Sequence, residues 1–242
     1  MQACASASGT DYVGGAYVEV PSRRPAHPAL VVAFHYLGGT GRDLAATENL
    51  GTLADRQGVV VAYPDARSGK RWELNRADGE ADIRATDRLI TVLERRLCVD
   101  PRRIYLAGVS NGAGFAARAA CELADRVAAV VPIAGSYKAL DACPRSGPRV
   151  ALLEIHGERD PFLPSVPRLL RWWLPRDGCA ARALVSHPSR GVERTRWAGC
   201  DVQRVLLAKT GHGWPGSFVL GADPTGFDAS DALWRFVRDK RR

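Results

Sequence analysis

The stretch "GVSNGAG", residues 108–114, places a serine between glycines directly after the apolar run "IYLA" and before the helix-forming run "FAARAACELA". Glycine is favoured where a Cβ cannot be accommodated. The spacing Gly108, Ser110, Gly112 therefore predicts a sharp strand-to-helix turn that exposes Ser110 in a strained conformation. This is the geometry of a nucleophile elbow. The same spacing also occurs in ordinary loops, so a catalytic Ser110 requires partners elsewhere in the chain.

Two later segments supply the partners that a serine nucleophile needs. Asp160 lies in "HGERDPFLP" after one apolar run, and His212 lies between two glycines in "TGHGWPG" after the next. Taken alone, the aspartate could cap a helix and the histidine could belong to a surface loop. Their order decides the interpretation, because nucleophile, acid and histidine follow one another in this way in α/β-hydrolase triads. An imidazole would take the serine proton, and a carboxylate would fix the imidazole tautomer.

The other histidines fit this chemistry less well. His27 precedes the first predicted strand, and His187 lies in an irregular segment. His156 directly follows a predicted strand, where we expect it to shape the loop that carries Asp160.

The oxyanion of an acyl-transfer intermediate requires two hydrogen-bond donors. The first is expected to be the backbone N–H of Asn111, which follows the serine at the start of a helix. The second is expected from the glycine-containing loop "FHYLGGTG", where Leu37 is our candidate donor.

Strand-length apolar runs alternate with helix-forming segments along most of the chain. Because the runs are continuous, we expect strands that are covered on both faces. The order predicts a doubly wound, mostly parallel α/β sheet of the α/β-hydrolase fold, with reactive groups beyond the carboxyl ends of its strands. Predicted strands occupy 29–34, 58–63, 103–108, 127–135, 149–157 and 202–209; predicted helices occupy roughly 43–57, 80–97, 112–124, 165–175 and 228–239, the last capped by Asp228 or Ser230.

Length and composition indicate one soluble catalytic domain. We assign residues 28–242 to it, with an N-terminal segment, 1–27, that could add an edge strand, and an irregular excursion over 176–200. No apolar stretch approaches the roughly 20 residues needed to cross a bilayer. The net charge of +8 is spread along the chain without a nucleic-acid-binding motif, so no nucleic-acid partner is expected. No Cys/His spacing suggests a metal site, and no cofactor is expected.

The six cysteines are an even number, which is compatible with disulfides and with an exported protein. Several could instead be small buried apolar residues, and Cys121, in the helical stretch after the elbow, is the best candidate for this role. The start "MQACASASGT" lacks the features of a signal peptide, so we expect a secreted or periplasmic protein whose signal peptide has been removed.

Taken together, "CVDPRRIYLAG", "GVSNGAG", "ACELADRVAAVVPIAG", "HGERDPFLP" and "TGHGWPG" resemble the secreted esterase family that groups polyhydroxybutyrate depolymerases with feruloyl and acetylxylan esterases. The resemblance runs from about residue 28 to the C-terminal helix. It implies a catalytic triad of Ser110, Asp160 and His212.

Two positions depart from the family pattern. Tyr36 stands where the family usually has glycine, so it adds bulk beside the oxyanion loop and could contact substrate. Glu158 stands where the family usually has threonine. The resemblance also implies a disulfide between Cys179 and Cys200, whereas Cys4, Cys98, Cys121 and Cys143 are not assigned to pairs.

Trp214 follows the candidate histidine by two residues and is restrained by Pro215. It could form a flat wall for part of an ester substrate, or it could pack beneath the histidine loop and hold it in place.

The leading hypothesis is a serine carboxylic-ester hydrolase that acts through an acyl-enzyme on feruloyl- or acetyl-type carbohydrate esters. Depolymerisation of short-chain polyhydroxyalkanoate is the alternative within this class. A non-catalytic binding protein with a hydrolase fold is the alternative from another class, although its expected sign, a missing triad residue, is not found.

Overall fold

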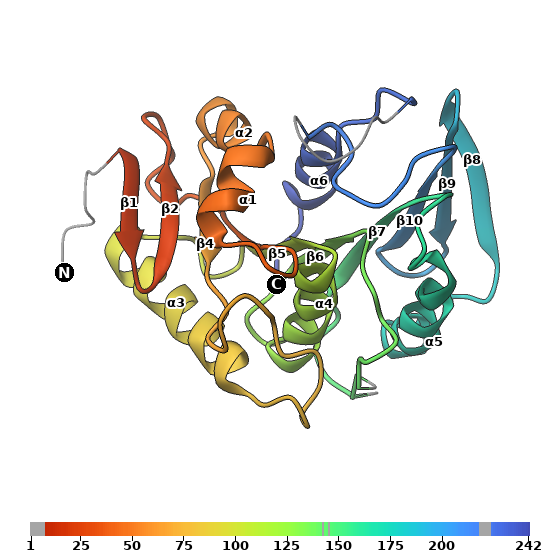
Figure 1. Ribbon diagram of the computed structural model, residues 1–242, viewed down its shortest axis with the longest axis horizontal. Coiled ribbons are helices and arrows are strands. Elements are labelled where there is room, and N and C mark those ends of the chain that lie inside the picture. The colour runs from red at the N-terminus through yellow and green to blue at the C-terminus, as the bar shows by residue number, and fades with distance from the viewer. Residues whose placement is uncertain (1–7, 142, 145, 218–223) are drawn as a thin grey trace.

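The computed structural model describes residues 8–141, 143–144, 146–217 and 224–242. Within them, ten strands form one sheet in the order β1-β2-β4-β3-β5-β6-β7-β10-β9-β8. The six central strands are parallel, and an antiparallel pair extends the sheet at each edge (Figure 1). The central strands are β4 (Val60–Pro64), β3 (Leu30–Phe34), β5 (Ile104–Val109), β6 (Ala129–Ile133), β7 (Ala151–Gly157) and β10 (Val202–Leu207).

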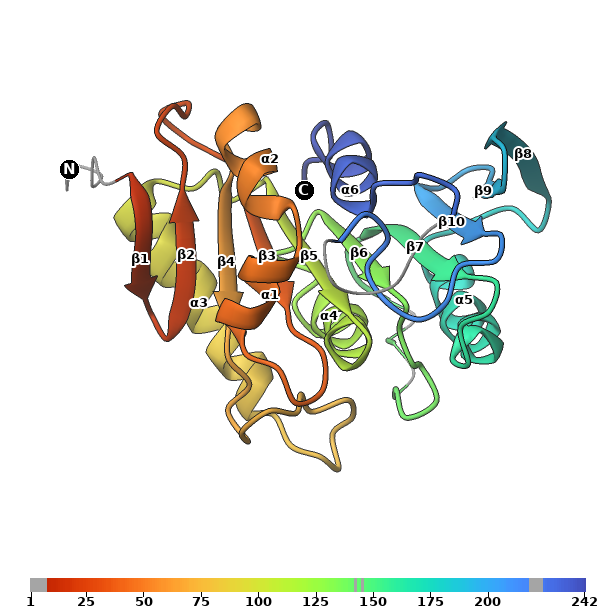
Figure 2. The ribbon, with the colours of Figure 1, turned by 45° about the horizontal axis from the view of Figure 1, so that its top comes forward.

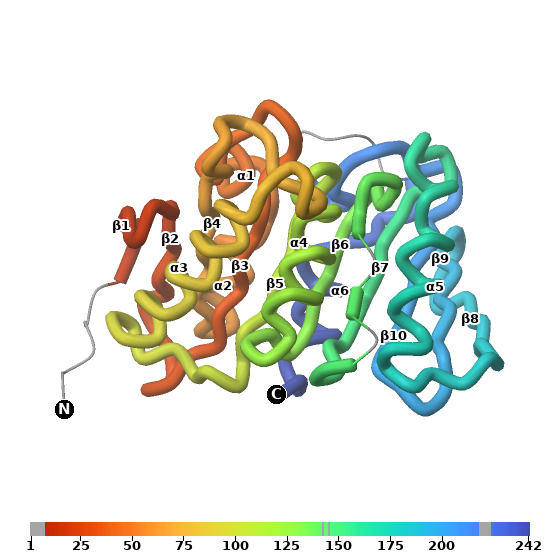
Figure 3. Tube along the Cα trace, turned by 90° about the horizontal axis from the view of Figure 1, so that it is seen from below, coloured from red at the N-terminus to blue at the C-terminus, as the bar shows by residue number. Residues whose placement is uncertain are grey.

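Helices cover both faces of this sheet, as Figure 2 shows. One face carries α1 (Gly41–Thr47), α2 (Leu50–Gln57) and α6 (Ala229–Val237). The opposite face carries α3 (Ala81–Leu97), α4 (Asn111–Glu122) and α5 (Val166–Arg176), which cross the strands in Figure 3. The doubly wound α/β class expected from the sequence is therefore confirmed.

The alternation of side chains along β3 explains why its sequence is apolar throughout. Leu30, Val32 and Phe34 belong to the core beneath α3, α4 and α5, whereas Val31 and Ala33 belong to the core beneath α1, α2 and α6. A strand covered on both sides must be apolar at every position, because successive side chains point to opposite faces.

Both edges of the sheet are hairpins. The N-terminal segment contributes β1 (Gly9–Val13) and β2 (Ala16–Val20), and β2 pairs with β4. At the other edge, β8 (Ala183–Ser189) and β9 (Val192–Trp197) extend the sheet from β10. The irregular excursion expected over 176–200 is thus wrong for most of its length. Strand β8 is exposed almost throughout, and its sequence is apolar only over its first three residues, so it lacks the continuous apolar run that marked the central strands.

The expected helix over 43–57 is divided in two. Glu48, at the end of α1, has an extended backbone with φ −100° and ψ 138°, and α2 starts after Asn49. Asp228 caps α6 by accepting a hydrogen bond from the N–H of Asp231. None of the helices in the described residues has the length and apolar character needed to cross a membrane.

Two disulfides are seen among the described residues. Cys179 pairs with Cys200, with their Cα atoms 4.9 Å apart. Cys121 pairs with Cys143 across 5.5 Å, so the expectation that Cys121 is a free buried residue is wrong. Helix α4 packs beside the loop after β6, which brings the two cysteines together although no sequence pattern indicated this pair. Cys98 is also disulfide-bonded, and Cys4 lies outside the described residues.

Candidate active site

Ser110 occupies a strained turn between β5 and α4. Its backbone has φ 58° and ψ −117°, values that a residue with a side chain rarely adopts. A Cβ on Gly108 would overlap the backbone of Gly112, and a Cβ on Gly112 would overlap the carbonyl of Phe34 in β3. The two glycines are therefore required because the turn is folded tightly on itself and against the neighbouring strand.

The structure brings Ser110, His212 and Asp160 together at the carboxyl ends of their strands. The Oγ of Ser110 lies 2.9 Å from Nε2 of His212, and Nδ1 of His212 lies 2.9 Å from Oδ2 of Asp160. The imidazole is one-third exposed, while the carboxylate is fully buried. This arrangement leaves the serine and one face of the imidazole open to a ligand and shields the acid from water.

Asp160 is held in position by the start of its own loop. Its Oδ1 accepts a hydrogen bond of 2.8 Å from the N–H of Phe162, which leaves Oδ2 to face His212. Glu158 has a different task, because its carboxylate accepts from the N–H of Lys209, a residue with φ 59°. The glutamate thus stabilises the strained backbone at the base of the histidine loop and does not compete with Asp160.

The expected oxyanion loop follows β3 and is organised by His35. The N–H of Ala66 donates to Nε2 of His35 at 3.3 Å, so the imidazole proton lies on Nδ1, which donates to the carbonyl of Tyr36 at 2.8 Å. Burial lowers the pKa of His35, which favours this neutral form. Because N–H and C=O point in opposite directions across a trans peptide, the N–H of Leu37 is directed away from His35. Among the described residues, no backbone carbonyl accepts from it.

Trp72, which the sequence did not single out, joins this loop to the elbow. Its indole N–H donates to the carbonyl of His35 at 2.9 Å, and its backbone N–H donates to the side chain of Asn111 at 2.8 Å. The ring also stacks on Phe115 of α4. One buried tryptophan therefore connects the loop that carries Leu37 with Asn111, and these two residues are the expected donors.

Two side chains expected to contact substrate differ in exposure. Tyr36 is half-buried, and its ring packs closely over Gly39 at the edge of the oxyanion loop. Trp214 is fully buried, and its indole N–H donates to Oγ of Ser230 in α6 at 3.1 Å. The indole faces the core beneath the histidine loop, which favours the supporting role of Trp214 over contact with substrate.

Phe162 is the aromatic side chain that lies against the imidazole. It is half-buried, its ring centroid is 5.1 Å from that of His212, and the two rings meet edge to face. The sequence signal was its position two residues after Asp160 in "DPFLP", where the loop must turn back toward the histidine. Phe162 therefore provides an apolar surface beside the imidazole, the kind of surface for which Trp214 was the sequence candidate.

Known proteins resemble this chain in sequence and in fold. The model of the family described as esterase PHB depolymerase matches residues 17–143. A probable feruloyl esterase C from Aspergillus terreus is 28% identical over 218 residues, which cover 86% of this chain and 76% of the relative. A bifunctional acetylxylan esterase/xylanase from Neocallimastix patriciarum is 25% identical over 91% of this chain, and the match spans only 32% of that longer protein.

Among solved structures, an acetyl xylan esterase from Aspergillus awamori superposes with a TM-score of 0.77 and 18% identity, covering 95% of this chain and 98% of the other. A carboxylesterase from Mesorhizobium loti gives a TM-score of 0.67 at 14% identity, covering 96% of this chain and all of the other. The family match covers more than half of the sequence, and the fold neighbours agree with it. The chain therefore belongs to the esterase PHB depolymerase family and has the α/β-hydrolase fold of a serine esterase.

Proposed function

We propose that the protein hydrolyses carboxylic esters through an acyl-enzyme, with Ser110 as nucleophile, His212 as general base and acid, and Asp160 as the orienting carboxylate. The observation that carries the proposal is the continuous chain of two 2.9 Å contacts from Ser110 through His212 to the buried Asp160. A serine hydroxyl is a weak nucleophile at neutral pH, and such an adjacent base is what activates it.

In the first half-reaction, Oγ of Ser110 forms a bond to the acyl carbon while its proton moves to Nε2 of His212. Collapse of the tetrahedral intermediate breaks the bond to the alcohol, which leaves with the proton from His212. A water molecule then attacks the acyl-serine with His212 again as the base, which releases the acid and restores Ser110. Asp160 stabilises the imidazolium that forms in each half-reaction without taking its proton.

The negative charge on the tetrahedral intermediate would be stabilised by the N–H groups of Asn111 and Leu37. Asn111 is the first residue of α4, so its N–H has no carbonyl partner within the helix and lies at the positive end of the helix dipole. The peptide group that joins Tyr36 to Leu37 supports Leu37 as the second donor. Its carbonyl faces His35, so the N–H of Leu37 points away from His35.

The substrate class that we favour is a feruloyl or acetyl ester of a carbohydrate. The names of the relatives support it, and the ring of Phe162 offers an apolar surface next to the imidazole of His212. The description of the matching family supports a second candidate, depolymerisation of polyhydroxybutyrate or a related short-chain polyester. The disulfides support an exported protein, because such bonds persist in oxidising compartments.

Covalent labelling with a fluorophosphonate separates an esterase from a non-catalytic binding protein of the same fold. We expect one label per chain on Ser110 and none on Ser110→Ala, because only an activated serine reacts with this probe. Ser110→Ala should also lose ester hydrolysis while keeping its melting temperature. A folded wild-type protein that takes up no label would contradict the proposal.

The roles of the other two residues differ in the size of their effects. His212→Ala should be as severe as Ser110→Ala, whereas Asp160→Asn should keep somewhat more activity, because the acid orients the base and transfers no proton. A Glu158 variant that loses more activity than Asp160→Asn would show that the acid is wrongly assigned.

The substrate classes can be separated by a hydrolysis panel of p-nitrophenyl acetate and butyrate, methyl ferulate, acetylated xylan and hydroxybutyrate oligomers. We expect the highest kcat/KM for methyl ferulate or acetylated xylan. A preference for hydroxybutyrate oligomers would assign the protein to the second candidate.

A further inference from the structure

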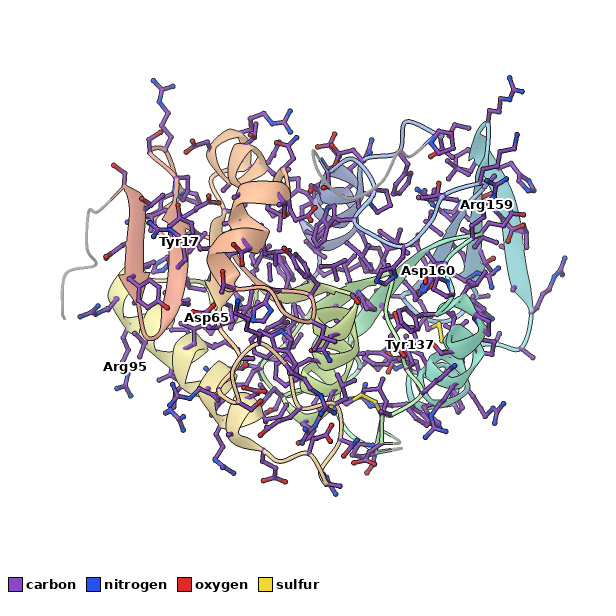
Figure 4. The ribbon with its side chains drawn as sticks, viewed as in Figure 1. Tyr17, Asp65, Arg95, Tyr137, Arg159 and Asp160 are labelled. Atoms are coloured by element: carbon purple, nitrogen blue, oxygen red, sulfur yellow. A yellow bond between two sulfur atoms is a disulfide. The ribbon has the colours of Figure 1, made fainter. Side chains whose placement is uncertain are left out.

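A second histidine with its own carboxylate lies next to Asp160. His156 in β7 contacts Oε1 of Glu154 through Nδ1, and its Nε2 lies 3.5 Å from Oδ2 of Asp160. The hydroxyl of Tyr137 donates to the same Glu154 oxygen at 3.3 Å. Figure 4 labels Tyr137 and Asp160, the two ends of this cluster. Its members are 0 to 3% exposed, so water does not screen their charges.

The positions of the protons in this cluster follow from its contacts. Oxygen atoms of carboxylates face both ring nitrogens of His156, and a lone pair on either nitrogen would repel the oxygen opposite it. An imidazolium carries an N–H on each nitrogen and satisfies both contacts at once. Nε2 forms no hydrogen bond in the described structure, and the carboxylate oxygen that faces it is Oδ2 of Asp160 at 3.5 Å, so a proton on Nε2 would be stabilised by the charge of Asp160.

The charges around His156 favour the same form. Burial lowers the pKa of His156, but Glu154 and Asp160 together outweigh that effect and raise the pKa above its ordinary value. Arg204 on the neighbouring strand β10 acts in the opposite direction, and its own ion pair with Glu193, at 3.0 Å, reduces that opposition. Two further groups face the cluster: the hydroxyl of Tyr137 and, beyond Asp160, the imidazole of His212.

We propose that Glu154 and His156 are positioning residues for the triad: Glu154 holds His156 as an imidazolium, and His156 holds Asp160 ionised and turned toward His212. This inference rests on the proposed esterase mechanism. Glu154 and His156 form an ion pair outside the triad, and the hydroxyl of Tyr137 holds the Glu154 carboxylate in place.

The arrangement has a consequence for the reaction. Oδ2 of Asp160 is shared between His212 and His156, so the positive charge of His156 weakens the attraction of Asp160 for a proton on His212. Removing the charge of His156 should move the acid limb of the kcat/KM profile to higher pH, by about half a pH unit or more for charges a few ångströms apart.

The charge of His156 can be measured on the wild-type protein by NMR of protein labelled with ¹⁵N-histidine. There are five histidines, and each signal can be assigned by substituting one histidine at a time. We expect both ring nitrogens of His156 to carry protons at pH 7. A neutral His156 ring at this pH would overturn the proposal, and this measurement does not depend on whether a variant of the cluster folds.

The effect on the reaction is tested with Glu154→Gln and His156→Gln, together with Tyr137→Phe as a milder change. Glu94→Gln is the matched control, because it makes the same carboxylate-to-amide change in the ion pair between Glu94 of α3 and Arg126. We expect the acid limb to shift upward in the first two variants, less in Tyr137→Phe and not in the control. A fall in kcat with an unmoved acid limb would assign the cluster a purely structural role and overturn the proposal.

Failure of this inference is distinguishable from failure of the proposed function. If Ser110→Ala retains hydrolysis, the esterase mechanism itself is wrong. If Ser110→Ala is inactive but the acid limb is the same in the wild type and the cluster variants, only the role of Glu154 and His156 is wrong.

Discussion

The backbone N–H of Arg159 donates to the carbonyl of Thr210 at 2.9 Å and joins the loop that carries Asp160 to the loop that carries His212. The contact is close because Gly157, at the end of β7, has no side chain. A Cβ at Gly157 would overlap the carbonyls of Thr210 and Gly211. The position of Asp160 relative to His212 is therefore set by backbone packing.

Gly157→Ala should separate the two loops. A displacement near 1 Å in a catalytic group can cost about 100-fold in rate, so we expect kcat to fall by one to two orders of magnitude. Gly211→Ala is the control, since a Cβ there meets open space next to the same histidine. Steady-state kinetics on p-nitrophenyl acetate measure kcat for the two variants. Equal kcat values for Gly157→Ala and Gly211→Ala would show that the two loops can move apart without loss of activity.

Trp214→Ala should lower the stability of the folded protein and leave its preference among esters unchanged. Truncating a fully buried tryptophan leaves a cavity and costs about 3 to 5 kcal/mol of unfolding free energy. All esters should then be hydrolysed more slowly by the same factor, because the histidine loop loses its support. A large change in the ratio of methyl ferulate to p-nitrophenyl acetate turnover would contradict this expectation and indicate that Trp214 contacts substrate.

Phe162→Ala should show the opposite pattern. Its half-buried ring lies edge to face with the imidazole, so we expect it to contact the acyl group or the alcohol of a bound ester. Loss of an aromatic contact of about 1 kcal/mol should lower kcat/KM for methyl ferulate several-fold more than for p-nitrophenyl acetate. Phe162→Leu is the companion variant, which keeps apolar volume but not the ring. Equal losses on both esters would indicate that Phe162 only supports His212.

The pH dependence of activity should reflect the need for a neutral base. We expect kcat/KM to rise with pH through the range in which an ordinary imidazole loses its proton, at about 6 to 7. A profile that stays flat from pH 5 to 8, with chemistry limiting the rate, would argue against a histidine base.

Glu48 should make the folded protein less stable as the pH rises. Burial raises its pKa from 4.5 to about 8, with Asp228 adding to the rise and a hydrogen bond from Thr47 opposing it. Between these two values the unfolded chain loses the proton and the folded chain keeps it, so the free energy of unfolding falls with increasing pH. Glu48→Gln removes this ionisation. Its stability relative to wild type should therefore increase from pH 5 to pH 8, by on the order of a few kcal/mol.

Urea denaturation of wild type and Glu48→Gln at several pH values measures this difference. The exposed Glu80, substituted in the same way, is the control. A stability difference between Glu48→Gln and wild type that does not change with pH would show that Glu48 is ionised in the folded protein.

The sequence predicted the central part of this fold well, because its signals are local there. Strands covered on both faces must be apolar at each position, which made the runs around Val31 and Val131 recognisable without any knowledge of their neighbours. The glycines around Ser110 and the order of Ser110, Asp160 and His212 were likewise readable, since each belongs to one short segment at the end of a strand.

Other features depend on segments that the sequence does not connect. Strand β8 carries little apolar pattern because it lies exposed at the edge of the sheet. The pairing of Cys121 with Cys143 depends on how α4 packs beside a loop. His156 lies near the end of β7 and touches Glu154 and Asp160, a cluster that exists only because the loop carrying Asp160 folds back over the end of that strand.

The sequence by itself therefore determined which residue types could perform acyl transfer, their order along the chain and the parallel sheet that brings strand ends together. Only the tertiary structure decided that Trp214 is buried while Phe162 contacts the imidazole of His212. It also decided that a second histidine, His156, lies next to Asp160. The physical reason is that a motif specifies local backbone conformation, whereas the burial and charge of a side chain are set by neighbours that are distant in sequence.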